Sequence, residues 1–266
     1  MKVAIIGYGT VGHNLAKELS KLDPDIIDKY KPKENKIRKE VGEEYDIAFV
    51  CVDTPRMEGN PCYIEEVFNA VLQNDAKIFV IKSTVLPGTS EFLAKSARGK
   101  KIVFSPEYYG GTQHCNNFQF DFTILGGEKE TCREVAQALQ RVYDGRHRFV
   151  YTDYRTAELA KYMENSFLAM KVSFCQQFFL LAKQFNVEYS ELRELFILDP
   201  RVNPSHTFVY EDQPYWDSHC LNKDVPAITE VGEAPLLSDM IMFNEWMKSG
   251  KYQEHIDSWR SRNLWA

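Results

Sequence analysis

The sequence of 266 residues lacks a long hydrophobic run. Its apolar opening, Val3 to Ile6, ends at a glycine, and no run approaches the ~20 residues that a membrane helix needs. We therefore expect neither a secretory signal nor a membrane partner. Contents of 44% hydrophobic and 26% charged residues are typical of a globular protein with one large or two modest domains.

The sequence also lacks a surplus of positive charge and a metal-like grouping of cysteines. The net charge of −6 argues against a nucleic-acid partner, because such a partner needs a concentrated basic face. The basic segment at residues 29–39 is interpreted as a solvated surface. The six cysteines form no CxxC pair, which predicts no metal site and indicates reduced thiols of a cytoplasmic protein.

A glycine turn follows the first predicted strand and precedes a helical pattern at residues 14–19. In the turn GYGTVG, Gly7 permits a tight bend, Gly9 lets the backbone approach a pyrophosphate, and Gly12 lets helix and strand pack closely. The N–H groups at the start of the helix favour phosphate binding. The predicted cofactor-binding residues of this turn are Gly7, Gly9, Thr10, Val11 and Gly12.

An acidic residue ends the next predicted strand. Asp28 lies 21 residues after Gly7, the spacing at which NAD-binding proteins hold the adenosine ribose hydroxyls. Its carboxylate would repel the extra phosphate of NADP. Because Lys29, Lys31 and Lys33 could partly offset that repulsion, the sequence predicts NAD as a preference.

Strands and helices alternate through the first half of the chain. Buried-strand patterns at residues 46–52 and 77–82 flank a helical stretch, which predicts an α/β fold with a Rossmann-like parallel sheet over residues 1–150. Ligands of such sheets bind beyond the carboxyl ends of the strands. We therefore add Thr54, Ser83 and Thr84, which follow two of these strands, to the cofactor site.

The second half, residues 151–266, is predicted to be a mainly helical domain, with nearly continuous helix over 156–197. Lys161 and Asn165 lie four residues apart and share a helix face. Beside a nicotinamide, this pair could stabilise an oxyanion. Taken alone, the pair is interpreted as an ordinary exposed helix surface.

Cys220 is predicted to lie in a loop after an irregular, aromatic-rich stretch, with Lys223 and Asp224 close behind. A nearby ammonium group favours the thiolate, which is the reactive form of cysteine. From these residues alone, a small buried apolar cysteine is the favoured interpretation.

Six motifs, in this order along the chain, resemble those of the nucleotide-sugar dehydrogenases of the UDP-glucose and GDP-mannose 6-dehydrogenase type. They are GYGTVG, VDTPRMEGN, KSTVLPGT, SPEYYGG, TAELAKYMENSFLAMKVSF and CLNKD. Members of this family continue into a second nucleotide-binding domain for the UDP or GDP of the substrate. The resemblance therefore implies a shortened relative without that domain.

The resemblance implies an NAD-dependent, two-step oxidation of a primary alcohol of a sugar or nucleotide sugar to a carboxylate. The cysteine that matches Cys220 captures the aldehyde of the first step, and water hydrolyses the thioester of the second. Lys161 and Asn165 match residues that stabilise oxyanions, and Glu107 matches the base of the hydrolysis. The family's helical region forms a dimer core, so we expect a homodimer.

Further roles follow from the same resemblance. Asp224 matches a residue that orients water or aids proton transfer, with Thr84 beside it. The residues implied to bind substrate are Glu107, Lys161, Asn165 and Lys223.

Two departures from the family pattern leave other functions open. Residues 215–219 lack the glycine pair that precedes the family's cysteine, and Glu107 is followed by YYGG in place of FLREG. One alternative is a one-hydride dehydrogenase of the β-hydroxyacid type, which uses Lys161 and Asn165 but no cysteine. The other is a dinucleotide-binding relative without catalytic activity.

Overall fold

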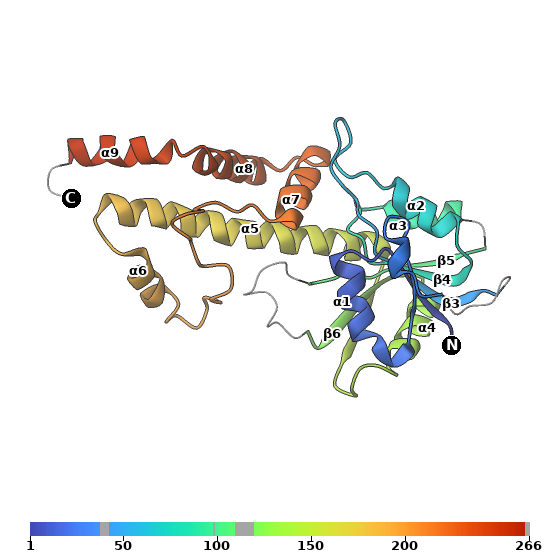
Figure 1. Ribbon diagram of the computed structural model, residues 1–266. Helices are drawn as coiled ribbons and strands as arrows, with labels where there is room; N and C mark the ends of the chain where they lie inside the picture. The colour runs from blue at the N-terminus through green and yellow to red at the C-terminus, as the bar shows by residue number, and fades with distance from the viewer. Residues whose placement is uncertain (38–42, 98, 110–119, 264–266) are drawn as a thin grey trace. The chain divides into compact units, whose positions relative to one another are not determined.

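The computed structural model describes residues 1–37, 43–97, 99–109 and 120–263 (Figure 1). The end of the basic segment at residues 38–39, the glycines Gly110 and Gly111, and Cys115 lie outside the described residues. Within the described part of the chain, no helix is both long and apolar enough to span a bilayer.

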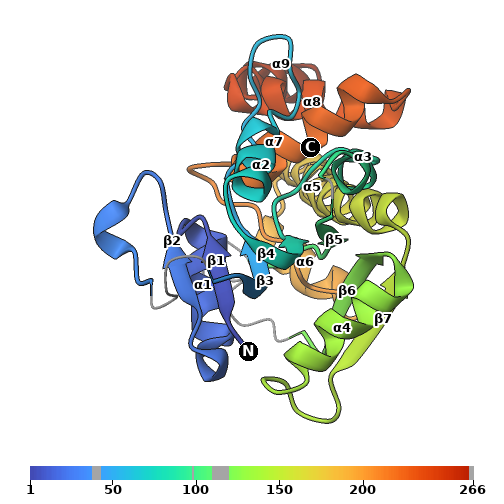
Figure 2. The ribbon, with the colours of Figure 1, turned by 90° about the vertical axis from the view of Figure 1, so that its right-hand side faces the viewer.

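Seven strands of the described residues form one sheet in the order β2-β1-β3-β4-β5-β6-β7 (Figure 2). From β2 to β5 all neighbours pair in parallel, as predicted, whereas β6 pairs antiparallel with β5 and parallel with β7. An antiparallel pair needs no crossover helix between its strands. The strands are β1 (Val3–Ile6), β2 (Asp25–Ile27), β3 (Tyr45–Val50), β4 (Ala76–Ile81), β5 (Lys101–Phe104), β6 (Phe122–Gly127) and β7 (Arg148–Thr152).

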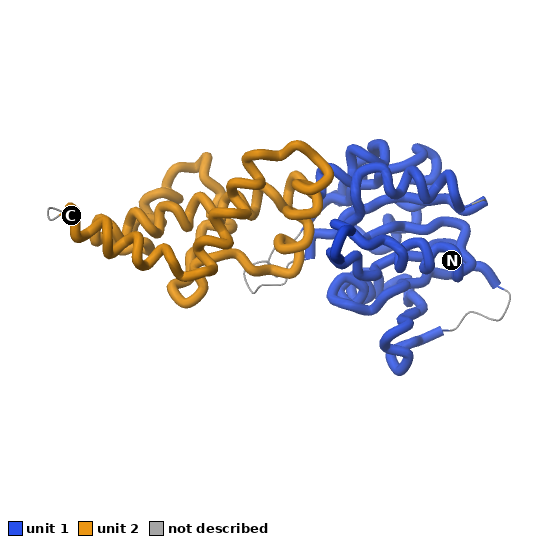
Figure 3. The backbone as a smooth tube through the Cα atoms, turned by 90° about the horizontal axis from the view of Figure 1, so that it is seen from above, with its two compact units in different colours: residues 1–161 blue, residues 162–266 orange. Residues whose placement is uncertain are grey.

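The chain divides into two compact units, residues 1–161 and 162–266 (Figure 3). The division falls within α5 (Tyr154–Gln184), a single helix that begins in the first unit and continues into the second. The first unit holds the sheet and the second is helical, so the predicted order of an α/β region followed by a helical region is confirmed.

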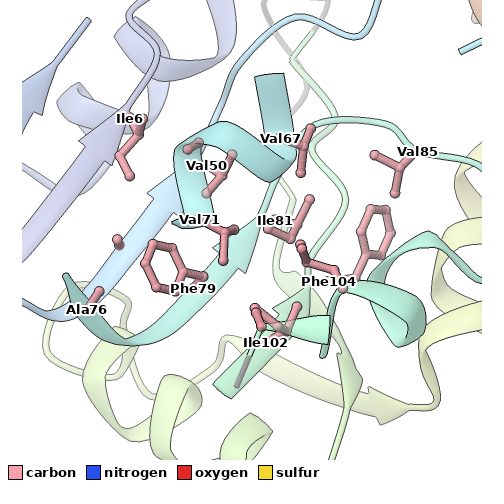
Figure 4. Close-up of a cluster of buried hydrophobic side chains, with 14 of the residues drawn as sticks. Ile6, Val50, Val67, Val71, Ala76, Phe79, Ile81, Val85, Ile102 and Phe104 are labelled. Atoms are coloured by element: carbon pink, nitrogen blue, oxygen red, sulfur yellow. The ribbon is translucent and has the colours of Figure 1, made fainter. Parts of the chain in front are cut away.

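Both faces of the sheet are buried, as the near-continuous apolar strands indicate. On one face, Phe79, Ile81 and Phe104 pack with apolar residues of α2, α3 and the start of α5 (Figure 4). On the other, Val80 and Val103 pack with residues of α1 and α4. The helices of this unit are α1 (Thr10–Glu18), α2 (Glu65–Leu72), α3 (Thr89–Ser96) and α4 (Lys129–Leu139), with short 3₁₀ turns η1 (Ser20–Leu22) and η2 (Pro32–Glu34).

The described residues of the second unit form two apolar clusters. One surrounds Trp216 and Val225, and the other surrounds Phe179 and Met247. Its helices, besides the rest of α5, are α6 (Tyr189–Phe196), α7 (His219–Val231), α8 (Pro235–Lys248) and α9 (Tyr252–Arg262). Cys220 therefore lies in the first turn of α7 and not in a loop, because Ser218 caps the helix just before it.

Candidate functional site

The glycine turn after β1 has the backbone that a dinucleotide-binding turn requires. Gly7 has a φ of +93°, and an added Cβ there would lie 2.7 Å from the carbonyl oxygen of Cys51. A Cβ on Gly12 would lie 1.9 Å from the carbonyl oxygen of Gly7. A Cβ on Gly9 would meet nothing within 4 Å. The turn is therefore closely packed at Gly7 and Gly12 and open at Gly9.

The open side of the turn coincides with the start of α1. Thr10 and Val11 are its first two residues, and Gly9 and Thr10 are exposed. The first N–H groups of a helix lack intrahelical acceptors and carry partial positive charge. The turn can therefore accept a pyrophosphate at this helix end.

Asp28 is held against the glycine turn. Its carboxylate accepts backbone N–H bonds from Tyr8 at 2.6 Å, Lys31 at 2.7 Å and Tyr30 at 2.8 Å. Burial acts to raise the pKa of Asp28, but these three bonds lower it below the usual value, so the group is ionised at neutral pH. A carboxylate has about four acceptor positions, which leaves one for a ribose hydroxyl.

Two of the three lysines after Asp28 have partners in the structure. Lys29 forms an ion pair with Glu66, and Lys31 donates to the carbonyl oxygen of Tyr8 at 3.1 Å. The positive charge of Lys31 also acts on Asp28 and helps to lower its pKa. The ionised carboxylate beside the glycine turn agrees with the preference for NAD that the sequence predicts.

We expect the protein to bind NAD at least about tenfold more tightly than NADP, a difference of about 1.4 kcal/mol. The Asp28→Ser variant should lose most of this discrimination, because the repulsive carboxylate is gone. The control is Asp46→Asn. It changes a carboxylate near the amino end of β3, which forms an ion pair with Lys77. Calorimetric titration with both cofactors measures the ratio, and equal or tighter binding of NADP to the unmodified protein would contradict the assignment of Asp28.

The polar turns after β3 and β4 meet at the same edge of the sheet. The Thr54 hydroxyl donates to the Thr84 carbonyl oxygen at 2.7 Å, and the Ser83 hydroxyl donates to the Val52 carbonyl oxygen at 2.6 Å. The buried Glu158 of α5 accepts N–H bonds from Gly88 and Ser90 at 2.6 and 2.8 Å. These bonds fix the turn that carries Thr84.

The turn after β5 carries Glu107, which is buried. Its carboxylate accepts the backbone N–H of Tyr109 at 2.7 Å. Lys82, also buried, donates to the Pro106 carbonyl oxygen at 3.1 Å. Burial lowers the pKa of Lys82, while the nearby carboxylates oppose this change. The turn is thus tied to the end of β4.

Lys161 is placed beside the same turn. It is 4% exposed, and its ammonium nitrogen lies 4.9 Å from the centroid of the Tyr108 ring. An ammonium over a ring face is attracted by the π electrons. Lys161 is therefore a buried cation and not the exposed helix surface that its sequence context alone would allow.

In the second unit, Asn165 and Asp224 come together. The Asn165 side-chain amide of α5 donates to Asp224 Oδ2 at 2.6 Å, and both residues are almost fully buried. Lys223 donates to the other carboxylate oxygen of Asp224 at 2.5 Å. The predicted residues Asn165, Lys223 and Asp224 thus form one charged and hydrogen-bonded group.

Cys220 lies on the same helix as Asp224, four residues earlier. Trp216 precedes Cys220 and forms two hydrogen bonds with the Asn244 side chain of α8. Asn244 accepts the backbone N–H of Trp216 at 2.9 Å and donates to its carbonyl oxygen at 3.0 Å. The Trp216 indole N–H also donates to Ser173 at 3.0 Å. Side-chain contacts therefore hold the segment in which the family pattern has glycines.

Three supporting residues were not identified from the sequence: Lys82, Glu158 and Asn244. The first two lie within recognised motifs, KSTVLPGT and AELAKY, so the motifs themselves could have indicated them. A charged residue at a strand end or on a helix is usually exposed, however, and no local pattern reveals its burial. Asn244 lies in a helix with no motif.

Comparison with known proteins gives consistent matches over both units. The NAD binding domain model of the UDP-glucose/GDP-mannose dehydrogenase family matches residues 32–145, and the central domain model of that family matches residues 155–246. The cofactor of the first unit is therefore NAD.

Two curated relatives are 26% identical to this chain. The UDP-N-acetyl-D-mannosamine dehydrogenase of Pyrococcus horikoshii aligns over 82% of this chain and 57% of its own length. For the UDP-glucose 6-dehydrogenase of Rickettsia prowazekii the shares are 86% and 59%. The chain thus spans less than three fifths of either relative.

A solved structure supports the fold. The UDP-D-ManNAc dehydrogenase from Pyrococcus horikoshii superposes with a TM-score of 0.77 at 20% identity, over 99% of this chain and 72% of that chain. Sequence and fold agree across the sheet unit and the helical unit. This chain belongs to the UDP-glucose/GDP-mannose dehydrogenase family.

Proposed function

We propose that the protein is an NAD-dependent oxidoreductase that converts a primary alcohol of a sugar or nucleotide sugar to a carboxylate through a thioester on Cys220. The observation that carries the proposal is the bond of 2.6 Å between Asn165 and the buried Asp224, on the helix that begins beside Cys220. A nucleophile, an amide donor and a carboxylate are the groups that this chemistry needs.

The residues of the first unit fit the cofactor. The close-packed glycine turn leaves its front open at the start of α1, and Asp28 retains an acceptor position for a ribose hydroxyl. When bound, NAD would accept the hydride of each oxidation. The overall reaction consumes one alcohol, two NAD and one water, and yields one carboxylate, two NADH and three protons.

Cys220 is proposed as the nucleophile. The N–H groups in the first turn of α7 stabilise negative charge and so favour the thiolate, which attacks the aldehyde carbon. The ammonium of the neighbouring Lys223 is paired with Asp224 and adds little net charge. Cys220 is partly exposed, as a nucleophile must be, whereas Cys51, Cys62, Cys132 and Cys175 are buried.

The remaining polar residues are proposed to stabilise charge and move protons. Lys161 and Asn165 would donate to the oxygen that becomes negative when the carbonyl carbon is attacked. Asp224 would orient water or take a proton, with the Thr84 hydroxyl assisting. Glu107 would act as the base that activates water for thioester hydrolysis.

A screen of nucleotide sugars and free sugars tests this function. UDP-glucose, GDP-mannose, UDP-N-acetylmannosamine and the corresponding free sugars are each incubated with the protein and NAD, and NADH is followed by absorbance. We expect one of these substrates to give NADH together with a carboxylate product. Saturable NAD binding without NADH formation from any of them would contradict the proposal.

We also propose that the protein forms a homodimer. Five apolar residues of α5 recur at intervals of four and seven and so lie on one helix face. They are 40–75% exposed in the single chain: Met163, Phe167, Phe174, Phe178 and Phe185. A contiguous exposed apolar stripe is typical of a protein–protein interface, and a second copy of the helix presents a matching surface.

The Phe167→Glu and Phe174→Glu variants are expected to be monomers, because each places a charge within this stripe. Phe92→Glu, at a 60% exposed phenylalanine of α3, should leave the association unchanged. Light scattering at micromolar concentration measures the mass. A monomeric unmodified protein, or dimers of all three variants, would contradict the homodimer.

A further inference from the structure

The turn that carries Glu107 is also connected to α1. Tyr109 donates its backbone N–H to Glu107 Oε2 at 2.7 Å and its hydroxyl to the carboxylate of Glu18, the last residue of α1. One residue therefore joins the Glu107 carboxylate to the helix that starts at the glycine turn.

The anchor at Glu18 is held firmly. Leu15 and Leu19, on either side of it, are buried in the cluster between α1 and the sheet, and Tyr109 packs against the same cluster. Burial raises the pKa of Tyr109 far above its usual range, so the hydroxyl keeps its proton and remains a donor at every working pH.

The second oxygen of Glu18 accepts the hydroxyl of Tyr143. Tyr143 lies between α4 and β7, outside the turn that carries Glu107. Two tyrosine hydroxyls thus bond to the carboxylate of Glu18. The bond from Tyr109 leads to Glu107, and the bond from Tyr143 does not.

We propose that Tyr109 is a positioning residue, which fixes the Glu107 carboxylate by anchoring its N–H donor to Glu18. This inference rests on the proposed role of Glu107 as the base. The family pattern FLREG has leucine at this position, which offers no hydroxyl for such an anchor.

Amide hydrogen exchange of the Tyr109→Phe variant tests the anchor without any substrate. We expect the Tyr109 amide, followed through the overlapping peptides of residues 101–109, to exchange at least about fivefold faster than in the unmodified protein. The control Tyr143→Phe removes the equivalent bond to Glu18 and should leave this amide unchanged. Retained NAD affinity shows that both variants fold.

The same variants separate positioning from a general structural role. With the best substrate of the sugar screen, Tyr109→Phe should lower kcat and KM together, each roughly tenfold, and leave kcat/KM nearly unchanged, because displacement of the base makes thioester hydrolysis rate-limiting. Tyr143→Phe should behave like the unmodified protein.

An unchanged exchange rate in Tyr109→Phe, or equal changes in both variants, would overturn the inference. Faster exchange with an unchanged kcat would overturn it too. If no sugar is oxidised, the proposed function fails, while the exchange rates still decide whether Tyr109 fixes the carboxylate.

Discussion

Replacement of Cys220 by serine is expected to reduce carboxylate formation at least about a thousandfold. A serine hydroxyl is far less nucleophilic than a thiolate at neutral pH, so the aldehyde is not captured. NAD affinity should stay within about twofold, because the glycine turn and Asp28 belong to the first unit. Product analysis by mass spectrometry and calorimetric titration measure the two quantities.

Cys132→Ser provides the matched control. Cys132 is fully buried in α4, and its pKa is raised to about 11 by burial, so it is not expected to be nucleophilic. Iodoacetamide should label Cys220 faster than the buried Cys51, Cys62, Cys132 and Cys175. A Cys220 that labels no faster than these thiols would count against the thioester mechanism.

The two alternative functions give different patterns for the same variants. In a one-hydride dehydrogenase, Cys220→Ser would scarcely affect turnover, and Lys161→Met would be the damaging change. In a protein that only binds the dinucleotide, neither substitution would alter any measured rate.

Gly12→Ala is expected to lower the free energy of unfolding by about 3 kcal/mol or more. The added Cβ would lie 1.9 Å from the carbonyl oxygen of Gly7, so the helix and the turn must move apart. NAD binding should be lost with the geometry of the turn. Chemical denaturation and calorimetric titration measure both effects.

Gly9→Ala separates packing from ligand contact. A Cβ at Gly9 would meet nothing within 4 Å, so stability should change by no more than about 1 kcal/mol. NAD affinity should nevertheless fall at least about tenfold, because the backbone of Gly9 has to approach the pyrophosphate. Unchanged NAD affinity in Gly9→Ala would mean that the open side of the turn does not face the cofactor.

The local part of the site could be predicted from the sequence. The glycine turn and Asp28 are separated by a fixed strand, turn and helix, so their spacing determines that they meet. Lys161 and Asn165 could be assigned to one helix for the same reason. Their burial could not, because it depends on residues distant in the sequence.

Contacts between distant segments account for what the sequence did not reveal. The hydrogen bonds between Trp216 and Asn244 join residues 28 positions apart, and Glu158 accepts an N–H bond from Gly88, 70 residues earlier. Cys220 is helical because Ser218 caps the start of α7. In the sequence, Ser218 could not be told apart from the irregular segment before it. The antiparallel β6 likewise reflects pairing with β5 and not the local composition of its residues.

The ratio of NADH formed to sugar consumed tests the central claim most directly. A two-step oxidation through Cys220 predicts two molecules of NADH for each molecule of sugar, with a carboxylate as the product. A ratio of one with an aldehyde or ketone as the final product would contradict the thioester mechanism and indicate a one-hydride dehydrogenase.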